Sequence, residues 1–223
     1  PDNIGEAAKV AIPAGEGPDI FAWANDSIGD QALSGNIVAL NAHAATLHYQ
    51  YQERAAPPQH RSLLIDAGAQ VCGYAADITR TYGDGGSRFS ALLEAVNEVQ
   101  LALVARVRPG QDYVQLRLEA HHALAGVLRA HGIVRMSAEG MVESGVSSVF
   151  FPHGLGHYLG LQVHDVAGLQ RGEDGGSIER PPGHPYLRLT RVLEAGMVVT
   201  IEPGIYFIDM LLAKLKDDTA LAR

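Results

Sequence analysis

The sequence predicts an α+β fold in which helices pack on an antiparallel sheet. Three observations support this fold class: strand-like runs occupy residues 37–81, two amphipathic helical segments follow, and residues 197–206 return to strand character. The chain has 223 residues, of which 47% are hydrophobic, so it can bury one sizeable core. We interpret residues 1–35 as a weakly specified lead-in and residues 36–223 as a single domain.

Two hairpins are expected in the first half of the chain. Residues 37–40 and 45–49 are strand-like runs separated by an Asn-Ala-His turn, which favours pairing between them. Residues 62–66 and 74–81 contain further apolar and β-branched residues and form the second predicted hairpin.

Two helices and then a long loop are predicted after the hairpins. Apolar residues recur with a period of 3.6 over residues 89–107. Asp112 resembles the first residue of a capping box, and the helix that it opens ends at a His-Gly pair. The apolar stripes are expected to lie in the core, whereas His121 and His122 are interpreted as part of a solvated face. Residues 168–187 are rich in glycine, proline and charge and are interpreted as a loop.

Composition excludes several classes of partner. The formal net charge is -8 at pH 7 and no run of lysine or arginine occurs, so a nucleic-acid partner is not expected. The chain shows neither a signal peptide nor a long apolar span, and we expect a cytoplasmic location without a membrane partner. The single cysteine, Cys72, cannot form an internal disulfide and is interpreted as a buried structural thiol.

Residues 151–165 contain three histidines, His153, His157 and His164, interspersed with glycines. Imidazole is the commonest side-chain metal ligand, and glycine allows backbone and ligand to approach closely. The alternative is a glycine-rich turn whose histidines are merely exposed. Acidic residues elsewhere in the chain favour a site.

Three carboxylates, Asp66, Asp77 and Glu202, lie in or after apolar runs that resemble core strands. Burying a carboxylate is costly unless it is paired or binds a cation. Each one could instead pair with an arginine or cap a turn, but the three together with His157 favour a metal site. This donor set suits Mn²⁺, Co²⁺ or Zn²⁺, and two ions that share a water would serve peptide or phosphoester hydrolysis.

These residues lie in long motifs that resemble those of the pita-bread metallopeptidases. The motifs are Ile65-Asp66-Ala67-Gly68, Ala76-Asp77-Ile78-Thr79-Arg80-Thr81, Pro152-His153-Gly154-Leu155-Gly156-His157 and Thr200-Ile201-Glu202-Pro203-Gly204-Ile205-Tyr206. Within that family the chain is most similar to the bacterial prolidases, which are Xaa-Pro dipeptidases, through residues 38–41, 47–49 and 161–168. The resemblance runs from about Asn36 to Leu212 and implies the pita-bread fold.

The resemblance implies two divalent metal ions, with Mn²⁺ as the expected metal and Co²⁺ or Zn²⁺ as alternatives. Asp66, Asp77, His157 and Glu202 would be the metal ligands, and Asp77 would bridge both ions. Glu202 would also act in catalysis, because it would take the proton from the attacking water.

The resemblance also implies a set of residues on the substrate side. His153 and His164 would orient the substrate and stabilise the tetrahedral intermediate, and His48 is a further substrate-side histidine. Arg188 would hold the C-terminal carboxylate of the dipeptide, since its planar fork of donors suits that group. Arg191 is the rival for this role.

The implied function is hydrolysis of Xaa-Pro dipeptides by a metal-bridged hydroxide in a homodimer, with hydrolysis of organophosphate esters as a side activity. The alternatives are an Xaa-Pro aminopeptidase and a non-catalytic pita-bread binding module. In the family, a later strand carries a Gly-Gly-x-Arg-x-Glu segment whose glutamate is a further bridging ligand, and the sequence after Leu212 has no such segment. We therefore expect a catalytic domain that is truncated at its C-terminus, which bears on the activity of this chain alone.

Overall fold

The structure is a computed structural model that describes residues 37–47, 49, 51, 55, 57–83 and 87–217. The chain divides into two compact units. The sheet unit comprises Pro1–Gly85 and Gly160–Val163, and the helical unit comprises Gly86–Leu159 and His164–Arg223. Helices and antiparallel sheets in these units confirm the predicted α+β class. Among the described residues, no helix is both long and apolar enough to cross a bilayer.

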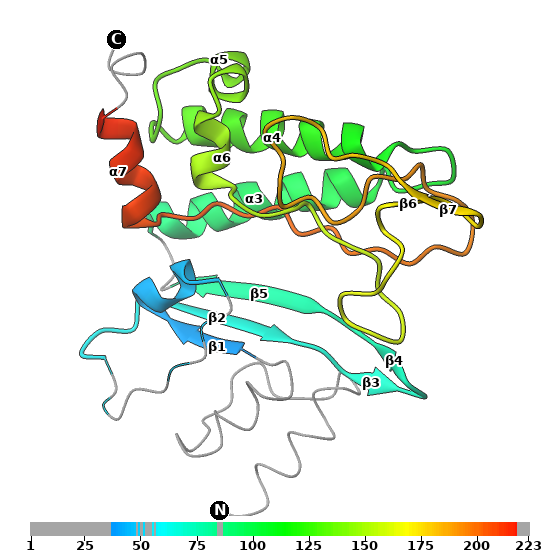
Figure 1. The fold of residues 1–223 in the computed structure, drawn as a ribbon. Coiled ribbons are helices and arrows are strands. Elements are labelled where there is room, and N and C mark those ends of the chain that lie inside the picture. The colour runs from blue at the N-terminus through cyan, green and yellow to red at the C-terminus, as the bar shows by residue number, and fades with distance from the viewer. Residues whose placement is uncertain are drawn as a thin grey trace, which may run out of the picture. The chain divides into compact units, whose positions relative to one another are not determined.

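Three antiparallel strands form the main sheet of the sheet unit, in the order β1-β2-β5 (Figure 1). They are β1 (Ile37–Leu40), β2 (Ser62–Ala67) and β5 (Ile78–Gly83). Leu64 of β2 lies opposite Ala39 on one side and Thr81 on the other, so apolar and β-branched residues pair across the sheet. The predicted pairing of β2 with a strand that includes Thr81 is confirmed.

The strand that pairs with β2 begins later than the sequence predicts. Tyr74–Ala75 forms the separate strand β4, which pairs with β3 (Gln70–Val71). Cys72 lies in the two-residue turn between them with a φ of 51°, and its side chain is exposed. The interpretation of Cys72 as a buried thiol is therefore wrong, because the residue turns the chain and does not pack.

The first predicted hairpin is also wrong. The residues that were expected to turn form a 3-10 helix, η1 (Asn41–Ala45), and the described residues 46, 47 and 49 lie in no strand. The side chain of Asn41 donates to the Gln59 carbonyl at 2.7 Å and accepts from the Arg61 N–H at 2.8 Å. These bonds tie the end of β1 to the start of β2, so β1 pairs with β2.

Two long helices of the helical unit, α3 (Arg88–Val104) and α4 (Tyr113–Ala130), lie side by side (Figure 1). The carboxylate of Asp112 caps α4 by accepting from the backbone N–H groups of Val114 and Gln115, at 2.8 and 3.2 Å. The structure confirms both predicted helices and the predicted cap.

Shorter elements complete the helical unit. They are α5 (Ala138–Glu143), α6 (Val146–Phe150), the two-stranded hairpin of β6 (Gln170–Gly172) and β7 (Gly175–Ser177), and α7 (Asp209–Asp217). The β6-β7 hairpin interrupts the loop that the sequence predicts over residues 168–187. Glu173 and Asp174 reverse the chain, and Gly175, the first residue of β7, has a φ of 89°, which glycine adopts without strain.

The core of the helical unit forms on the buried face of α4. Its fully buried residues include Tyr113, Leu116, Ala120, Phe151, Leu155, Leu187 and Leu189. This core joins α4 to the histidine-rich stretch and to the segment that carries Arg188. His121 lies on the same face with 0% exposure, and its Nδ1 bonds to the Ser147 hydroxyl at 3.0 Å. The interpretation of His121 as solvated is therefore wrong, whereas His122 is exposed as expected.

Candidate metal centre and substrate pocket

Two of the sequence motifs lie side by side in the helical unit. The backbone N–H of Thr200 donates to the His157 carbonyl at 3.0 Å, and an isolated antiparallel bridge joins Tyr158 to Val199. Residues 197–206 form this bridge and not the predicted regular strand, because their partner is the irregular, glycine-containing histidine stretch. The pairing sets two predicted metal ligands beside each other.

These two ligands, His157 and Glu202, are in contact: Nε2 of His157 lies 3.1 Å from Oε1 of Glu202. His157 is only 3% exposed. Its Nδ1 lies 2.8 Å from the carbonyl oxygen of Tyr158, which can only accept, so Nδ1 carries a proton and donates. In the neutral imidazole the lone pair is then on Nε2, the atom that faces Glu202.

This arrangement fits a divalent cation. An imidazole nitrogen and a carboxylate oxygen that bind one ion at about 2.1 Å and at right angles lie about 3 Å apart. The bond from Nδ1 to a backbone carbonyl is the outer contact with which metal-binding histidines fix their orientation. The side chains of His157 and Glu202 are therefore suited to hold a metal ion.

Thr200 links the two ligands; it begins the motif that contains Glu202, but the sequence alone assigns it no role. Its hydroxyl accepts from the backbone N–H of His157 at 3.0 Å and donates to Oε1 of Glu202. Thr200 is 7% exposed. Residues two apart in an extended segment point to the same face, so the spacing between Thr200 and Glu202 is the signal that could have identified it.

Gly156 allows the two motif segments to approach each other. A Cβ at this position would meet the Thr200 carbonyl oxygen and would lie 2.5 Å from the hydroxyl of Tyr113. Tyr113 is fully buried and donates from this hydroxyl to the Thr200 carbonyl at 2.8 Å. Burial, followed by the charge of Glu202, raises the pKa of Tyr113, so the hydroxyl keeps the proton that this bond needs.

His153 lies on the same stretch but has different partners. Its Nδ1 donates to the Gly154 carbonyl at 2.7 Å, and its Nε2 lies 3.1 Å from the hydroxyl of Tyr206. In the neutral imidazole Tyr206 is therefore the donor to Nε2. Tyr206 orients His153, and its place at the end of the Glu202 motif was the only sequence signal for it.

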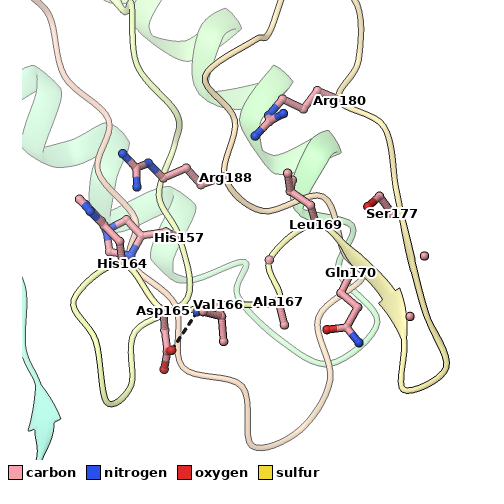
Figure 2. Close-up of a pocket in the computed structure, with 13 residues that line it drawn as sticks. His157, His164, Asp165, Val166, Ala167, Leu169, Gln170, Ser177, Arg180 and Arg188 are labelled. Carbon is pink, nitrogen blue, oxygen red and sulfur yellow. Dashed lines mark hydrogen bonds between the residues drawn. The ribbon is translucent and has the colours of Figure 1, made fainter.

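A pocket of about 570 Å³ opens beside His157 in the helical unit (Figure 2). His164 lines it, and its ring stands at 90° to that of His157 with centroids 4.4 Å apart. Arg188 lines the same pocket and appears in Figure 2 on the side where both histidines lie. Its rival Arg191 forms a 2.9 Å ion pair with Glu194 and is not among the described residues that line the pocket. The pocket therefore contains two predicted substrate residues.

Asp66 and Asp77 belong to the sheet unit and are half-buried there. Asp66 is paired with Thr79 in the register of β2 and β5, and Asp77 precedes Thr79 by two residues. Because side chains alternate along a strand, the two carboxylates are expected on the same face, diagonal to one another. The other two predicted ligands belong to the helical unit, so the convergence of all four stays a prediction. The predicted substrate residue His48 lies outside the described residues.

Comparisons with known proteins agree with the motifs. A sequence profile of metallopeptidase family M24 matches residues 20–221. An Xaa-Pro dipeptidase of Stenotrophomonas maltophilia (strain K279a) is 61% identical over 184 residues, which is 82% of this chain and 42% of that protein. An Xaa-Pro dipeptidase of Xanthomonas campestris pv. campestris (strain 8004) is 61% identical over 215 residues, which is 94% of this chain and 49% of that protein.

Solved structures are also similar, which confirms the expected pita-bread fold. The aminopeptidase PepP of Pseudomonas aeruginosa matches with a TM-score of 0.65 and 31% sequence identity; the match covers 81% of this chain and 38% of the PepP chain. Zn-substituted Escherichia coli aminopeptidase P in complex with product has a TM-score of 0.64 and 31% identity, covering 78% and 36%. The chain spans less than half the length of each of these four relatives. The profile match and the 61% identity to the dipeptidases show that the chain belongs to metallopeptidase family M24.

Proposed function

We propose that the protein hydrolyses Xaa-Pro dipeptides with two divalent metal ions. The observation that carries this proposal is the contact between Nε2 of His157 and Oε1 of Glu202, 3.1 Å apart, with His157 lining a pocket that also contains Arg188. A pair of metal ligands near a cationic side chain suits a substrate with a carbonyl to polarise and a free carboxylate to bind. Membership of family M24 supports the peptidase chemistry.

The proposed metal ligands are Asp66, Asp77, His157 and Glu202. When bound, the ions would lower the pKa of a water and polarise the scissile carbonyl. Glu202 would take the proton of the attacking water at its carboxylate. The hydroxyl of Thr200, which donates to Oε1 of Glu202, would keep that carboxylate in one orientation while it does so.

The substrate would lie in the pocket beside His157. His153 and His164 would orient it and stabilise the tetrahedral intermediate, and His48 is the further proposed substrate-side histidine. Arg188 would bind the substrate carboxylate. Among the residues that the structure describes, no side chain pairs with Arg188, so its fork of donors is available in the pocket.

An Xaa-Pro aminopeptidase is the second candidate, because the solved structures that resemble this chain are aminopeptidases P. Their identity is 31%, however, against 61% for the Xaa-Pro dipeptidases. The higher identity and the arginine in the pocket support the dipeptidase.

The proposal also includes Mn²⁺ as the native metal, a cytoplasmic homodimer, and hydrolysis of organophosphate esters as a side activity of the same centre. Elemental analysis of the purified full-length protein tests the metal. Light scattering tests the dimer, and release of the leaving group from an organophosphate ester tests the side activity.

The decisive experiment exchanges Arg188 for lysine in the full-length protein. A bidentate arginine-carboxylate contact is worth on the order of 1.5 to 3 kcal/mol, so Arg188→Lys should raise KM for an Xaa-Pro dipeptide at least about tenfold. Cleavage of the C-terminal amide of the same dipeptide should change little. Arg191→Lys is the matched control, because Arg191 pairs with Glu194.

Two results would contradict the proposal. Equal losses on the free acid and the amide would make Arg188 structural. Cleavage of longer Xaa-Pro peptides as efficiently as dipeptides by the unaltered protein would favour the aminopeptidase.

A further inference from the structure

Arg117 carries a buried charge that the proposed chemistry does not use. It lies on α4, is only 2% exposed, and pairs with no carboxylate among the residues that the structure describes. Its Nε donates to Nδ1 of His184 at 3.1 Å, and its Nη1 donates to the His153 carbonyl at 2.6 Å. Its guanidinium also lies over the ring of Phe151, 4.9 Å from the centroid.

Burying Arg117 in this way lowers the stability of the fold, so stability does not explain why an arginine lies here. A buried guanidinium loses its hydration, and its partners here are a carbonyl, a neutral imidazole nitrogen and an aromatic ring, none of which is an anion. Burial accordingly lowers the pKa of Arg117 to about 10. Apolar side chains would fill the same space without that cost. The role of Arg117 is therefore to be sought in what its hydrogen bonds hold in place.

The two hydrogen bonds of Arg117 end on two different parts of the site. The first part is the turn that carries His153, whose carbonyl is held by Nη1. The second part is the segment of residues 180–188, which contains His184 and ends at Arg188. One planar guanidinium therefore bonds to both parts and ties them to the same helix.

The segment of residues 180–188 is held together by its own hydrogen bonds. Nε of Arg180 donates to the Leu187 carbonyl at 2.6 Å, and the N–H of Leu187 donates to the His184 carbonyl at 3.3 Å. A displacement of His184 would therefore reach Leu187, the residue before Arg188. Leu187 is fully buried, so it cannot absorb the movement by swinging into solvent.

We propose that Arg117 is a positioning residue that fixes Arg188 relative to His153, and so sets how the substrate carboxylate is placed against the reacting carbonyl. This inference rests on the proposed dipeptidase function. It assigns to Arg117 no contact with substrate: the residue acts through His184 on one side and through the His153 backbone on the other.

His184 offers the sharpest test, because it is only partly buried and the protein should tolerate its exchange. His184→Asn keeps an acceptor near the place of Nδ1, whereas His184→Leu removes it. In the full-length protein, His184→Leu should lower kcat/KM for the Xaa-Pro free acid by about 10- to 100-fold, as misplacement of a binding group does. The C-terminal amide, which does not use Arg188, should lose much less, and His184→Asn should restore most of the selectivity for the acid. Arg117→Met should lower kcat on both substrates as well, because it also releases the His153 turn.

A second measurement does not depend on activity. Amide hydrogen exchange at Leu187, whose N–H bonds to the His184 carbonyl, should be faster in His184→Leu than in the parent and in His184→Asn. Unchanged exchange in His184→Leu would overturn the anchoring role, and equal losses on acid and amide would overturn the positioning role. A parent protein that cleaves no Xaa-Pro dipeptide would instead refute the proposed function, and exchange would still decide whether Arg117 anchors the segment.

Discussion

The tautomers of His153 and His157 are set by the backbone carbonyl of the residue that follows each of them. Nδ1 of His157 donates to Tyr158, and Nδ1 of His153 donates to Gly154. In each case Nε2 is left to face the site, toward Glu202 in one and toward Tyr206 in the other. The sequence predicts these histidines by residue type, but the tautomer depends on backbone direction, which only the folded turn provides.

Thr200 offers a direct test of how the two ligands are oriented. Thr200→Val keeps the shape of the side chain but removes the hydroxyl that bonds both His157 and Glu202. We expect metal affinity to fall about 10- to 100-fold, as it does when outer contacts of metal ligands are lost. Thr200→Ser should retain most of the affinity. Calorimetric titration of the metal-free protein with Mn²⁺ measures the effect, and equal affinities for the valine and serine variants would exclude this role.

His121 should make stability depend on pH. Burial, and then the charge of Arg117, lowers its pKa from 6.5 to about 3 in the folded protein. Between these two pKa values the unfolded chain binds a proton that the folded protein does not. The contribution of His121 to the free energy of unfolding is therefore fully present above pH 6.5 and is lost as the pH drops toward 3. The charged and titratable groups around His121 are Arg117, His184, His122 and His153.

His121→Asn should weaken this pH dependence. The amide can still bond to Ser147 but does not titrate, so the free energy of unfolding should fall by a few kcal/mol less between about pH 6 and pH 4 than in the parent. Urea unfolding across this range measures it. His60→Asn is the control, since His60 is exposed and is not among the groups around His121. A parent-like slope in His121→Asn would contradict the prediction.

The elements that the sequence predicts correctly are those with local signals. Helix α4 has a periodic apolar stripe and a capping aspartate, Asp112, and strand β2 has an apolar run that pairs with β5, the later part of the predicted partner strand. The errors have non-local causes. Asn41, at the start of η1, bonds to Gln59 and Arg61, which are 18 and 20 positions away. Residues 197–206 form only an isolated bridge and have no regular partner strand. Arg117 was missed for the same reason, because its partners His153 and His184 are far from it in the sequence. The bond of Thr200 to His157 is also long-range, whereas its bond to Glu202 is local.

Two glycines near the pocket, Gly168 and Gly172 at the end of β6, test whether a close backbone approach requires glycine. A Cβ at Gly168 would meet the carbonyl oxygen of Arg188, whereas a Cβ at Gly172 would have no atom within 4 Å. Gly168→Ala should therefore destabilise the protein by about 1 to 3 kcal/mol and raise KM for the dipeptide, because the Arg188 backbone must move. Gly172→Ala should do neither. Unfolding and kinetic measurements on both variants check this, and similar behaviour of the two would show that the close approach is unimportant.

At the scale of the whole molecule, the proposed metal centre needs residues from both units. The sheet unit contains Asp66 and Asp77, which are expected on one face, and the helical unit contains the contact of His157 with Glu202. Each pair alone is a weak cation site, because two ligands leave most of an ion's coordination to water. If the four share a centre, metal binding should couple the two units thermodynamically.

This coupling can be measured with one ligand variant from each unit. Asp77→Asn removes a charge with little change of shape, and His157→Asn removes the imidazole. Each variant should lower the metal content of the full-length protein. Each should also abolish most of the rise in Tm that Mn²⁺ gives the parent. The double variant should lose little more than either single one, because ligands of a shared centre are not additive. Asp174→Asn, an exposed aspartate in the helical unit, is the control and should bind metal like the parent. Full metal content in Asp77→Asn together with loss in His157→Asn would mean that the centre belongs to the helical unit alone.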